Sequence, residues 1–318
     1  MNDPPGVTRL APSPTGALHL GNARTFLINW LLARRHRWTI HLRVDDLDGP
    51  RVKVGADRGA IDDLNWLGLD YDHGPVYQST HVDQHQQALT RLFASGQAYA
   101  CVCSRREVDL AASAPHADDG ASVYPGTCRG RFSSVQDAFA KTGRASAVRF
   151  HVPEGAVEFT DSFVGPVRIE PARQLGDFVI AKSDLSPAYQ LAVVVDDASA
   201  GVTQVVRGDD LLDSTPRQIL LYRALDMSEK IPIYTHLPLV VGADGRRLAK
   251  RHGDTRLASY RAHNVPASRM LALLARWCGW PVMQGVSVNE LVDTFDLSRV
   301  PRGPVVMTDA DDRWLRNV

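Results

Sequence analysis

The chain of 318 residues lacks any long hydrophobic run. No stretch approaches the roughly 20 apolar residues that a membrane helix needs, so no membrane span is expected. Residues 1–6 lack the basic and apolar regions of a signal peptide, and we therefore expect a cytoplasmic protein. Internal repeats and low-complexity tracts are also missing, and the length predicts about two globular domains.

An excess of charge of either sign is missing too, because 36 Lys and Arg residues balance 36 Asp and Glu residues. This balance argues against a protein that coats nucleic acid nonspecifically, although it is compatible with a local basic face. Apolar residues make up 44% of the chain and charged residues 23%, which is typical of a soluble globular protein.

Cysteine is scarce, but its distribution is uneven. The four cysteines are Cys101, Cys103, Cys128 and Cys278. In a reduced cytosolic chain, the cluster of the first three indicates a metal site more than a disulfide. Structural zinc usually takes four protein ligands, so one is lacking, and Tyr124 and His116 are the candidates. Spacing alone leaves open three unlinked buried thiols. Cys278 lies in an apolar helical pattern and is expected in the core.

Hydrophobic periodicity predicts an α/β fold. Residues 7–11 read as a short buried strand, apolar residues alternate at 38–44 as in a second strand, and a helix is predicted between them over residues 22–35. Such a βαβ unit implies a parallel sheet of the Rossmann type. Further helical patterns occur at 60–67 and 82–93, and Gly96 is a plausible C-terminal stop of the second.

The middle of the chain differs in its hydrophobic pattern. Residues 101–143 show a weak pattern, and residues 148–169 read as short strands broken by proline and glycine, which indicates a small insert. The α/β pattern resumes with apolar runs at 178–180, 191–195 and 202–206. A helix is then predicted with Thr215 as N-cap and Pro216 at its first position, followed by a strand at 237–241. The tail from about residue 254 is predicted to be helical.

These patterns divide the chain into four segments. Residues 1–98 and 177–245 are expected to form the two halves of the catalytic domain, and residues 99–176 the insert with the zinc site. Residues 246–318 are expected to hold a basic loop and the helical C-terminal region.

The sequence contains no Walker A motif, and no G-x-G-x-x-G follows a strand, so a nucleotide must be held in another way. The candidate is the segment 11–22, between the first strand and its helix, where open α/β sheets bind ligands. The helix N-terminus offers N–H groups to a phosphate, Gly16 and Gly21 permit close backbone approach, and His19 can donate a hydrogen bond. The alternative is a proline-rich turn with an incidental histidine.

A second segment, residues 246–252, follows a predicted strand and an Asp244-Gly245 turn. A loop with Lys250 can reach the polyphosphate of ATP and stabilise the charge that develops on leaving pyrophosphate. The alternative is a solvated basic loop, which is what most charge runs are.

Together, HLGN at residues 19–22 and RLAKR at residues 247–251 resemble the HIGH and KMSKS signatures of class I aminoacyl-tRNA synthetases. The blocks RLAPSPTG (9–16), RVDDLD (43–48), YQLAVVVDD (189–197) and VRGDDL (206–211) resemble glutamyl-tRNA synthetases, in family order. The resemblance implies ATP-dependent activation of glutamate, with His19 and Lys250 as catalytic residues. It implies an ATP site made by Pro12, Gly16, His19, Gly21, Asn22 and Lys250.

The resemblance also implies a glutamate site, made by Arg9, Leu10, Ala11, Pro12, Ser13, Asp45, Tyr189 and Arg207. Arg9 and Arg207 would bind carboxylates, because the guanidinium fork bonds both oxygens of a carboxylate. Asp45 would face the α-ammonium, and Tyr189 would add a hydroxyl. Asp45 departs from the family, which usually has Glu there. For each residue a purely structural role is the alternative, such as an arginine paired at a sheet edge.

The chain also closely resembles a short relative of the glutamyl-tRNA synthetases, the glutamyl-queuosine tRNA(Asp) synthetases. Their zinc pattern, C-x-C followed by a spacer and Y-x-x-x-C, corresponds here to Cys101, Cys103, Tyr124 and Cys128, with a longer spacer. It implies one structural zinc per chain. The 66 residues after His252 leave no room for the helical domains that read the anticodon in full glutamyl-tRNA synthetases.

This resemblance implies activation of glutamate to glutamyl-adenylate without tRNA, with Mg²⁺ accompanying ATP. Transfer to the queuosine at the wobble position of tRNA(Asp) would follow, and we expect a monomer. Two alternatives stay open. One is a truncated or partnered glutamyl-tRNA synthetase that charges the tRNA 3′ end, and the other is a non-catalytic paralogue that binds nucleotide or tRNA.

Overall fold

The computed structural model describes residues 5–112, 123–246, 248, 253–281 and 285–316. Its strands are β1 (Val7–Leu10), β2 (Thr39–Val44), β3 (His73–Tyr77), β4 (Ala98–Cys101), β5 (Ala147–Phe150), β6 (Val157–Asp161), β7 (Gly165–Ile169), β8 (Phe178–Ala181), β9 (Gln204–Gly208), β10 (Ile233–Leu237), β11 (Val240–Val241) and β12 (Val305–Val306). Its α-helices are α1 (Leu20–His36), α2 (Ala56–Trp66), α3 (Val82–Ala94), α4 (Arg105–Ala112), α5 (Val135–Thr142), α6 (Pro171–Gln174), α7 (Tyr189–Ser199), α8 (Ser214–Ala224), α9 (Leu257–Ala262), α10 (Ala267–Trp277), α11 (Val288–Val292) and α12 (Asp309–Arg316).

The predicted parallel sheet is present, and it is split. Strands β1, β2 and β3 pair in parallel, and β9 and β10 form a second parallel pair. The two parts meet beside β1, where Thr203 N–H donates to the Val7 carbonyl at 2.9 Å. Chain order therefore runs away from β1 in both directions, and such a reversal is where open α/β sheets bind ligands.

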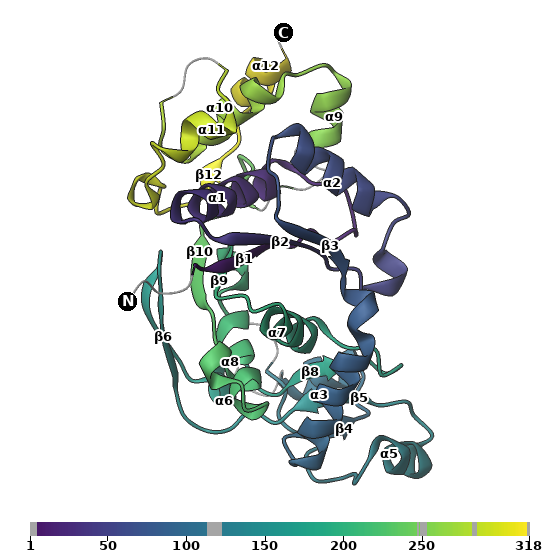
Figure 1. The fold of residues 1–318 in the computed structure, drawn as a ribbon. Coiled ribbons are helices and arrows are strands. Elements are labelled where there is room, and N and C mark those ends of the chain that lie inside the picture. Colours follow the sequence, from purple (N-terminus) through teal and green to yellow (C-terminus); the bar gives the residue numbers. More distant parts are fainter. Residues whose placement is uncertain (1–4, 113–122, 247, 249–252, 282–284, 317–318) are drawn as a thin grey trace.

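Two hydrophobic cores lie on opposite sides of this split sheet (Figure 1). One joins α1 and α2 to the C-terminal helices and includes Leu10, Leu42 and Leu237. The other joins α3, α7 and α8 to β5 and β8 and includes Val205 and Tyr234. Neighbouring residues of β9 face different cores, Val206 the first and Val205 the second, as expected of a strand that is covered on both faces.

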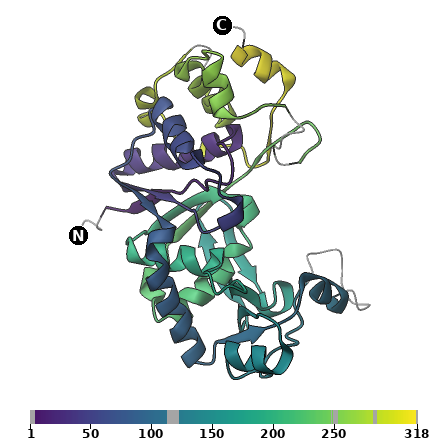
Figure 2. The same cartoon turned by 90° about the vertical axis from the view of Figure 1, so that its right-hand side faces the viewer.

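The insert forms its own antiparallel structure. Strands β4, β5 and β8 make one sheet, and β6 and β7 make a hairpin. The short strands expected at 148–169 are confirmed. Strand β8 follows the expected boundary at residue 176 but hydrogen-bonds to β5. Figure 2 shows this part at one end of an elongated molecule, with the C-terminal helices at the other end.

Three local predictions need correction or refinement. The apolar run at 191–195 lies in helix α7. Thr215 is inside the first turn of α8, whose N-cap is Asp213, because its hydroxyl accepts a hydrogen bond from Arg207. The strand expected at 237–241 is divided into β10 and β11 around Pro238, which has no N–H for a sheet.

Other local predictions are confirmed. Gly96 follows the end of α3 in the left-handed conformation, with φ of +72°, as a helix stop does. Cys278 is buried in the core. Within the described residues, no helix has the length and apolar character to cross a membrane.

Candidate active site at the split sheet

A cleft of about 750 Å³ opens at the carboxyl ends of β1 and β9. The predicted site residues that line it are Arg9, Ala11, Pro12, Ser13, Gly16, His19, Gly21, Asn22, Asp45, Tyr189 and Arg207. The side chain of Leu10 is instead fully buried in the core. Lys250 and His116 lie outside the described residues. The structure thus brings segments about 200 residues apart in the chain into one cavity.

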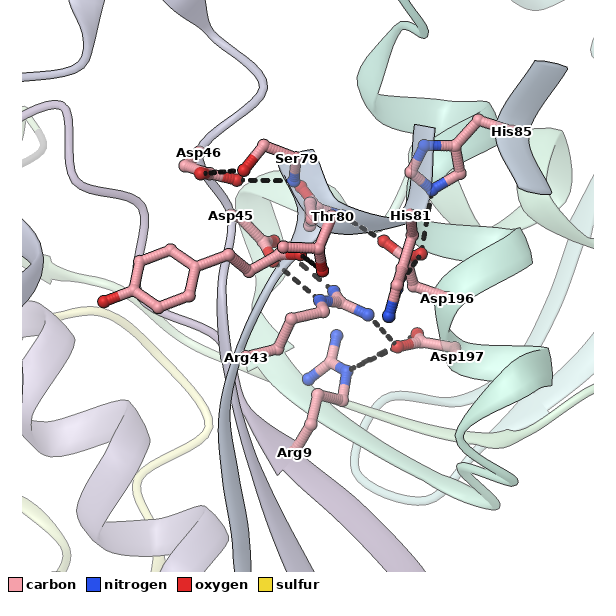
Figure 3. A network of polar contacts seen from close by, with 12 residues as sticks. Arg9, Arg43, Asp45, Asp46, Ser79, Thr80, His81, His85, Asp196 and Asp197 are labelled. Carbon is pink, nitrogen blue, oxygen red and sulfur yellow. Dashed lines mark hydrogen bonds and ion pairs between the residues drawn. The ribbon is translucent and has the colours of Figure 1, made fainter. Parts of the chain in front are cut away.

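Arg9, at the end of β1, belongs to a buried network of charges (Figure 3). Its Nε donates to Asp197 of α7 at 3.4 Å, and Arg43 of β2 donates to the same carboxylate at 2.5 Å. Arg43 also binds Asp45, with Nε 2.7 Å from Oδ1. Among the described residues, no acceptor forms a hydrogen bond with a terminal nitrogen of Arg9. Its guanidinium therefore keeps its fork for a ligand.

Asp45 is held by this network rather than standing alone. Its backbone N–H donates to the Pro12 carbonyl at 3.0 Å, which ties the end of β2 to the loop after β1. Burial raises the pKa of Asp45, and the charge of Arg43 opposes this shift. The carboxylate lines the cleft, so a ligand cation would share it with Arg43.

Asp196, the neighbour of Asp197, anchors α7 to the start of α3. It accepts hydrogen bonds from Gln78 at 2.7 Å and lies 2.8 Å from His85 Nε2 and 3.1 Å from His81 Nδ1. Its pKa is lowered: burial acts to raise it, but the hydrogen bond from His85 and the charge of Arg43 outweigh burial. The two adjacent acids therefore fix α7 on one side and the two arginines on the other (Figure 3).

Arg207, at the end of β9, has neutral partners. Its Nε donates to His236 Nε2 at 3.0 Å and its Nη1 to Gln218 at 3.0 Å. Its Nη2 donates to the Thr215 hydroxyl at 2.8 Å and to the Leu211 carbonyl at 3.4 Å. Among the described residues, no carboxylate forms an ion pair with Arg207. Its positive charge is thus buried beside the cleft without an anionic neighbour in contact.

His19 caps helix α1. Its Nδ1 accepts from the Gly21 N–H at 3.1 Å, while the Asn22 side chain accepts from the His19 N–H at 3.2 Å. A neutral ring with an accepting Nδ1 carries its proton on Nε2. A Cβ at Gly21 would lie 3.0 Å from the ring, so glycine there preserves the position of the imidazole.

The segment after the basic loop returns to this same helix start. His19 and Arg256 form an antiparallel bridge, Leu20 N–H donates to the Thr255 carbonyl at 3.1 Å, and Leu257 N–H donates to the Leu18 carbonyl at 2.9 Å. Leu248, on the other side of the loop, is buried in the core. Both ends of the basic segment are therefore fixed against the first signature.

The predicted metal ligands meet at the end of β4. The sulfurs of Cys101, Cys103 and Cys128 all lie within 4.8 Å of one another. The Tyr124 hydroxyl is 3.3 Å from Cys101 Sγ and 3.6 Å from Cys103 Sγ. Three thiols and a phenol oxygen around one point fit the ligand number of a closed zinc site, and the thiols are ligands of its usual type.

Four polar residues of the cleft region have no role in the sequence-based interpretation: Arg43, Asp161, Asp197 and His236. Arg43 and Asp197 lie inside blocks that the sequence singled out, and charged residues next to apolar runs are a usable signal. His236 and Asp161 give no such signal, because they meet only through tertiary pairing over 75 residues.

Comparison with known proteins agrees with this geometry. The model of one family, described as the catalytic domain of class I tRNA synthetases (E and Q), matches residues 7–309. A protein of Symbiobacterium thermophilum named Glutamyl-Q tRNA(Asp) synthetase is 47% identical over 93% of this chain and 94% of its own length. One of the same name from Rhodopirellula baltica is 42% identical over 95% and 97%.

Longer relatives match over part of their length. A Glutamate--tRNA ligase of Citrifermentans bemidjiense is 39% identical over 96% of this chain and 64% of its own length. In structure, a glutamate tRNA ligase from Elizabethkingia meningosepticum in complex with its amino acid superposes with a TM-score of 0.81. It is 26% identical, and the match covers 98% of this chain and 69% of that one.

Proposed function

Because this chain belongs to the family of class I tRNA synthetases for glutamate and glutamine, and is an enzyme of the aminoacyl-tRNA ligase type, we propose that it activates glutamate with ATP and transfers it to queuosine in tRNA(Asp). The observation that carries the proposal is the cleft at the split sheet, with two buried arginines facing one cavity. Near full-length similarity to proteins named Glutamyl-Q tRNA(Asp) synthetase supports the choice of acceptor.

Glutamate carries two carboxylates and one ammonium, and the cleft offers matching charges. We assign the side-chain carboxylate to Arg9, whose terminal nitrogens have no protein acceptor among the described residues, and the other carboxylate contact to Arg207. Asp45 faces the α-ammonium, and the half-exposed Tyr189 adds a hydroxyl at the rim. Ser13, Ala11 and Pro12 form the wall after β1. Leu10 is fully buried behind this wall and does not line the cleft.

The nucleotide is assigned to the start of α1. The positive end of its dipole favours phosphate, and the residues Pro12, Gly16, His19, Gly21 and Asn22 line the same cavity. The reaction is an in-line attack of the glutamate α-carboxylate on the α-phosphate, with pyrophosphate leaving. The protein supplies positioning and charge stabilisation, with Mg²⁺ accompanying ATP. The role of Lys250 on the leaving pyrophosphate rests on the family resemblance.

The cysteine cluster is assigned to structural zinc. Cys101, Cys103, Tyr124 and Cys128 would supply four ligands, which leaves no open position for a substrate. The metal would join β4 to the segments that carry Tyr124 and Cys128. It would stabilise the insert and take no part in the chemistry.

ATP–pyrophosphate exchange with glutamate, run with and without tRNA, tests the proposal. Exchange without tRNA supports it, exchange only with tRNA favours a glutamyl-tRNA synthetase that charges the 3′ end, and no exchange favours a binding paralogue. A second assay uses labelled glutamate, ATP and bulk tRNA with or without queuosine. Label that needs queuosine and is released by mild alkali, as an ester is, supports the acceptor. Label on queuosine-free tRNA would overturn it.

A further inference from the structure

A chain of three buried side chains runs from the β6–β7 hairpin to the cleft. Asp161, at the end of β6, lies 2.7 Å from His236 Nδ1, and His236 Nε2 lies 3.0 Å from Arg207 Nε. Asp161 is 1% exposed, His236 0% and Arg207 5%. Only the last of the three reaches the cavity.

The direction of each proton in this chain follows from chemistry. Arginine has only donors, so Nε2 of His236 must accept from Arg207. An ionised Asp161 only accepts, so Nδ1 of His236 must donate to it. The Thr215 hydroxyl, 3.2 Å from Nε2, is compatible with this arrangement. The ring is therefore a neutral imidazole with its proton on Nδ1. If Nε2 also carried a proton, the imidazolium would be a second cation in contact with the Arg207 guanidinium.

The neighbouring groups agree with a neutral ring. Tyr234 stacks on His236 with ring centroids 6.1 Å apart, and the same tyrosine lies 5.3 Å from the Arg207 guanidinium carbon. Burial lowers the pKa of His236, although the hydrogen bond to Asp161 and the nearby Asp209 act in the other direction. The hydrogen-bond geometry alone already fixes the tautomer.

Asp161 uses its two oxygens for two purposes. Oδ1 accepts from the backbone N–H groups of Phe163 and Val164, at 2.9 Å and 2.8 Å, and so closes the hairpin turn. Oδ2 lies against the His236 ring. The backbone N–H of His236 donates to Oδ1 at 3.2 Å and to Oδ2 at 3.1 Å. A substitution that preserves Oδ1 therefore keeps an acceptor for all three backbone N–H groups and changes the group that faces the ring.

We propose that Asp161 and His236 are positioning residues that hold the Arg207 guanidinium in the orientation that receives the substrate carboxylate, through a histidine kept neutral with its proton on Nδ1. This inference deepens the proposed function and rests on it. Four N–H groups of Arg207 are held by His236, Gln218, Thr215 and the Leu211 carbonyl, which leaves one on Nη1 and the charge for a ligand. A rotation of the guanidinium would misplace the remaining N–H group and the charge relative to the ligand.

The tautomer is testable without any substrate. In ¹⁵N NMR of histidine-labelled protein, the His236 signals are identified by their loss in His236→Gln. We expect a neutral Nδ1–H pattern across neutral pH in the wild type. A proton on Nε2, or an imidazolium near pH 7, would overturn the inference whatever the enzyme's substrate is.

Kinetics provide the second test. In Asp161→Asn, Oδ1 still closes the turn, but the amide N–H₂ faces the ring, which must then accept on Nδ1 and present Nε2–H to Arg207. This donor-to-donor conflict should raise the glutamate KM roughly tenfold or more in pyrophosphate exchange. The ATP KM should stay unchanged. The amide of His236→Gln can both donate and accept a hydrogen bond. This variant should therefore raise the glutamate KM less than His236→Leu does.

Asp177→Asn is the matched control, because Asp177 is equally buried and bound to an arginine, but its partners are Arg129 and Tyr99 rather than His236 and Arg207. It should leave the glutamate KM unchanged. An equal KM shift in both variants, or none in Asp161→Asn, would contradict the positioning role. Absence of glutamate-dependent exchange in the wild type would instead remove the proposed function, and the NMR result would still stand.

Discussion

Two buried polar clusters of this protein are completed in different ways. In the cleft, the side chains of Arg9, Arg43, Asp45 and Asp197 form ion pairs with one another before any substrate arrives. At the end of β4, three thiols surround the Tyr124 hydroxyl, and Arg149 is the basic side chain in contact, with its Nε 3.3 Å from Cys101 Sγ.

The two clusters differ in the ligand that each is suited to bind, a substrate carboxylate in the cleft and a metal at the cysteines. Arginines already fixed by protein acceptors lose little freedom when a carboxylate arrives, so their contribution is to affinity and selectivity. Thiols gathered in a metal-sized cluster gain most from a metal that binds them as thiolates, so their contribution is to folding. Substitutions in the cleft should therefore change kinetics, and those at the cysteines should change stability.

The largest kinetic effect is expected from Arg207→Lys. An ammonium cannot replace a fork that makes four hydrogen bonds, and His236, Gln218 and Thr215 would lose their donors. We expect a loss of roughly 10²- to 10³-fold in kcat/KM for glutamate, as for the truncation of a buried charged group. The measurement is steady-state pyrophosphate exchange, and the control is Arg223→Lys at an exposed position of α8. Equal activity of the two variants would show that Arg207 is only structural.

Arg9→Ala should have the next largest effect. It removes the cation assigned to the side-chain carboxylate, so the glutamate KM should rise by about 10²-fold and the preference over glutamine should fall with it. ATP binding should change little. Exchange kinetics with glutamate and glutamine measure both quantities, and Arg91→Ala on the surface is the control. If the preference over glutamine survives, Arg9 is wrongly assigned and Arg207 is the next residue to test.

Cys128→Ser should affect stability rather than glutamate kinetics. Loss of one of four ligands should release the metal and lower the Tm by roughly 5 °C or more. Native mass spectrometry of zinc-replete protein and a thermal scan measure the two effects. Cys278→Ser, in the core between α1 and α11, should retain the metal. Wild-type protein without bound metal would rule the zinc site out.

The smallest effect is expected from Asp45→Glu. It restores the residue usual in the family and keeps the charge that faces the ammonium, so kcat/KM for glutamate should change by only about two- to threefold. Asp45→Asn removes that charge and leaves Arg43 with a weaker partner, and should be clearly worse. The measurement is kcat/KM for glutamate in both variants. Equal activity of Asp45→Glu and Asp45→Asn would show that Asp45 does not bind the ammonium.

How much of the cleft the sequence predicts depends on the range of the interactions involved. Strand β1, helix α1 and strand β2 follow from local periodicity, and parallel strands bring Arg9, Asp45 and Arg207 to one edge. The split of the sheet beside β1 follows from no local pattern. It depends on how β9 and β10 dock, which tertiary packing decides.

The interpretations that failed or were missed share a cause. Thr215 has the composition of an N-cap, but the Arg207 guanidinium, eight positions earlier, takes its hydroxyl. Pro238 looks like part of an apolar strand, yet it interrupts the strand, and its carbonyl accepts from the buried Arg24 at 2.7 Å. In each case an arginine of another element forms a hydrogen bond with the residue concerned, and a single sequence does not record such pairs.

The bridge between His19 and Arg256 has a consequence for synthesis on the ribosome. Residues 18–20 are made early, but their backbone partners, 255–257, emerge only after most of the chain. The nascent chain can form β1, α1 and β2 from local contacts, because N-terminal parts fold first during translation. The start of α1 lacks its backbone partners until residues 255–257 have been made. A nascent chain stalled before residue 255 would carry an assembled sheet and an incomplete nucleotide site, so activity would arise only near the end of translation.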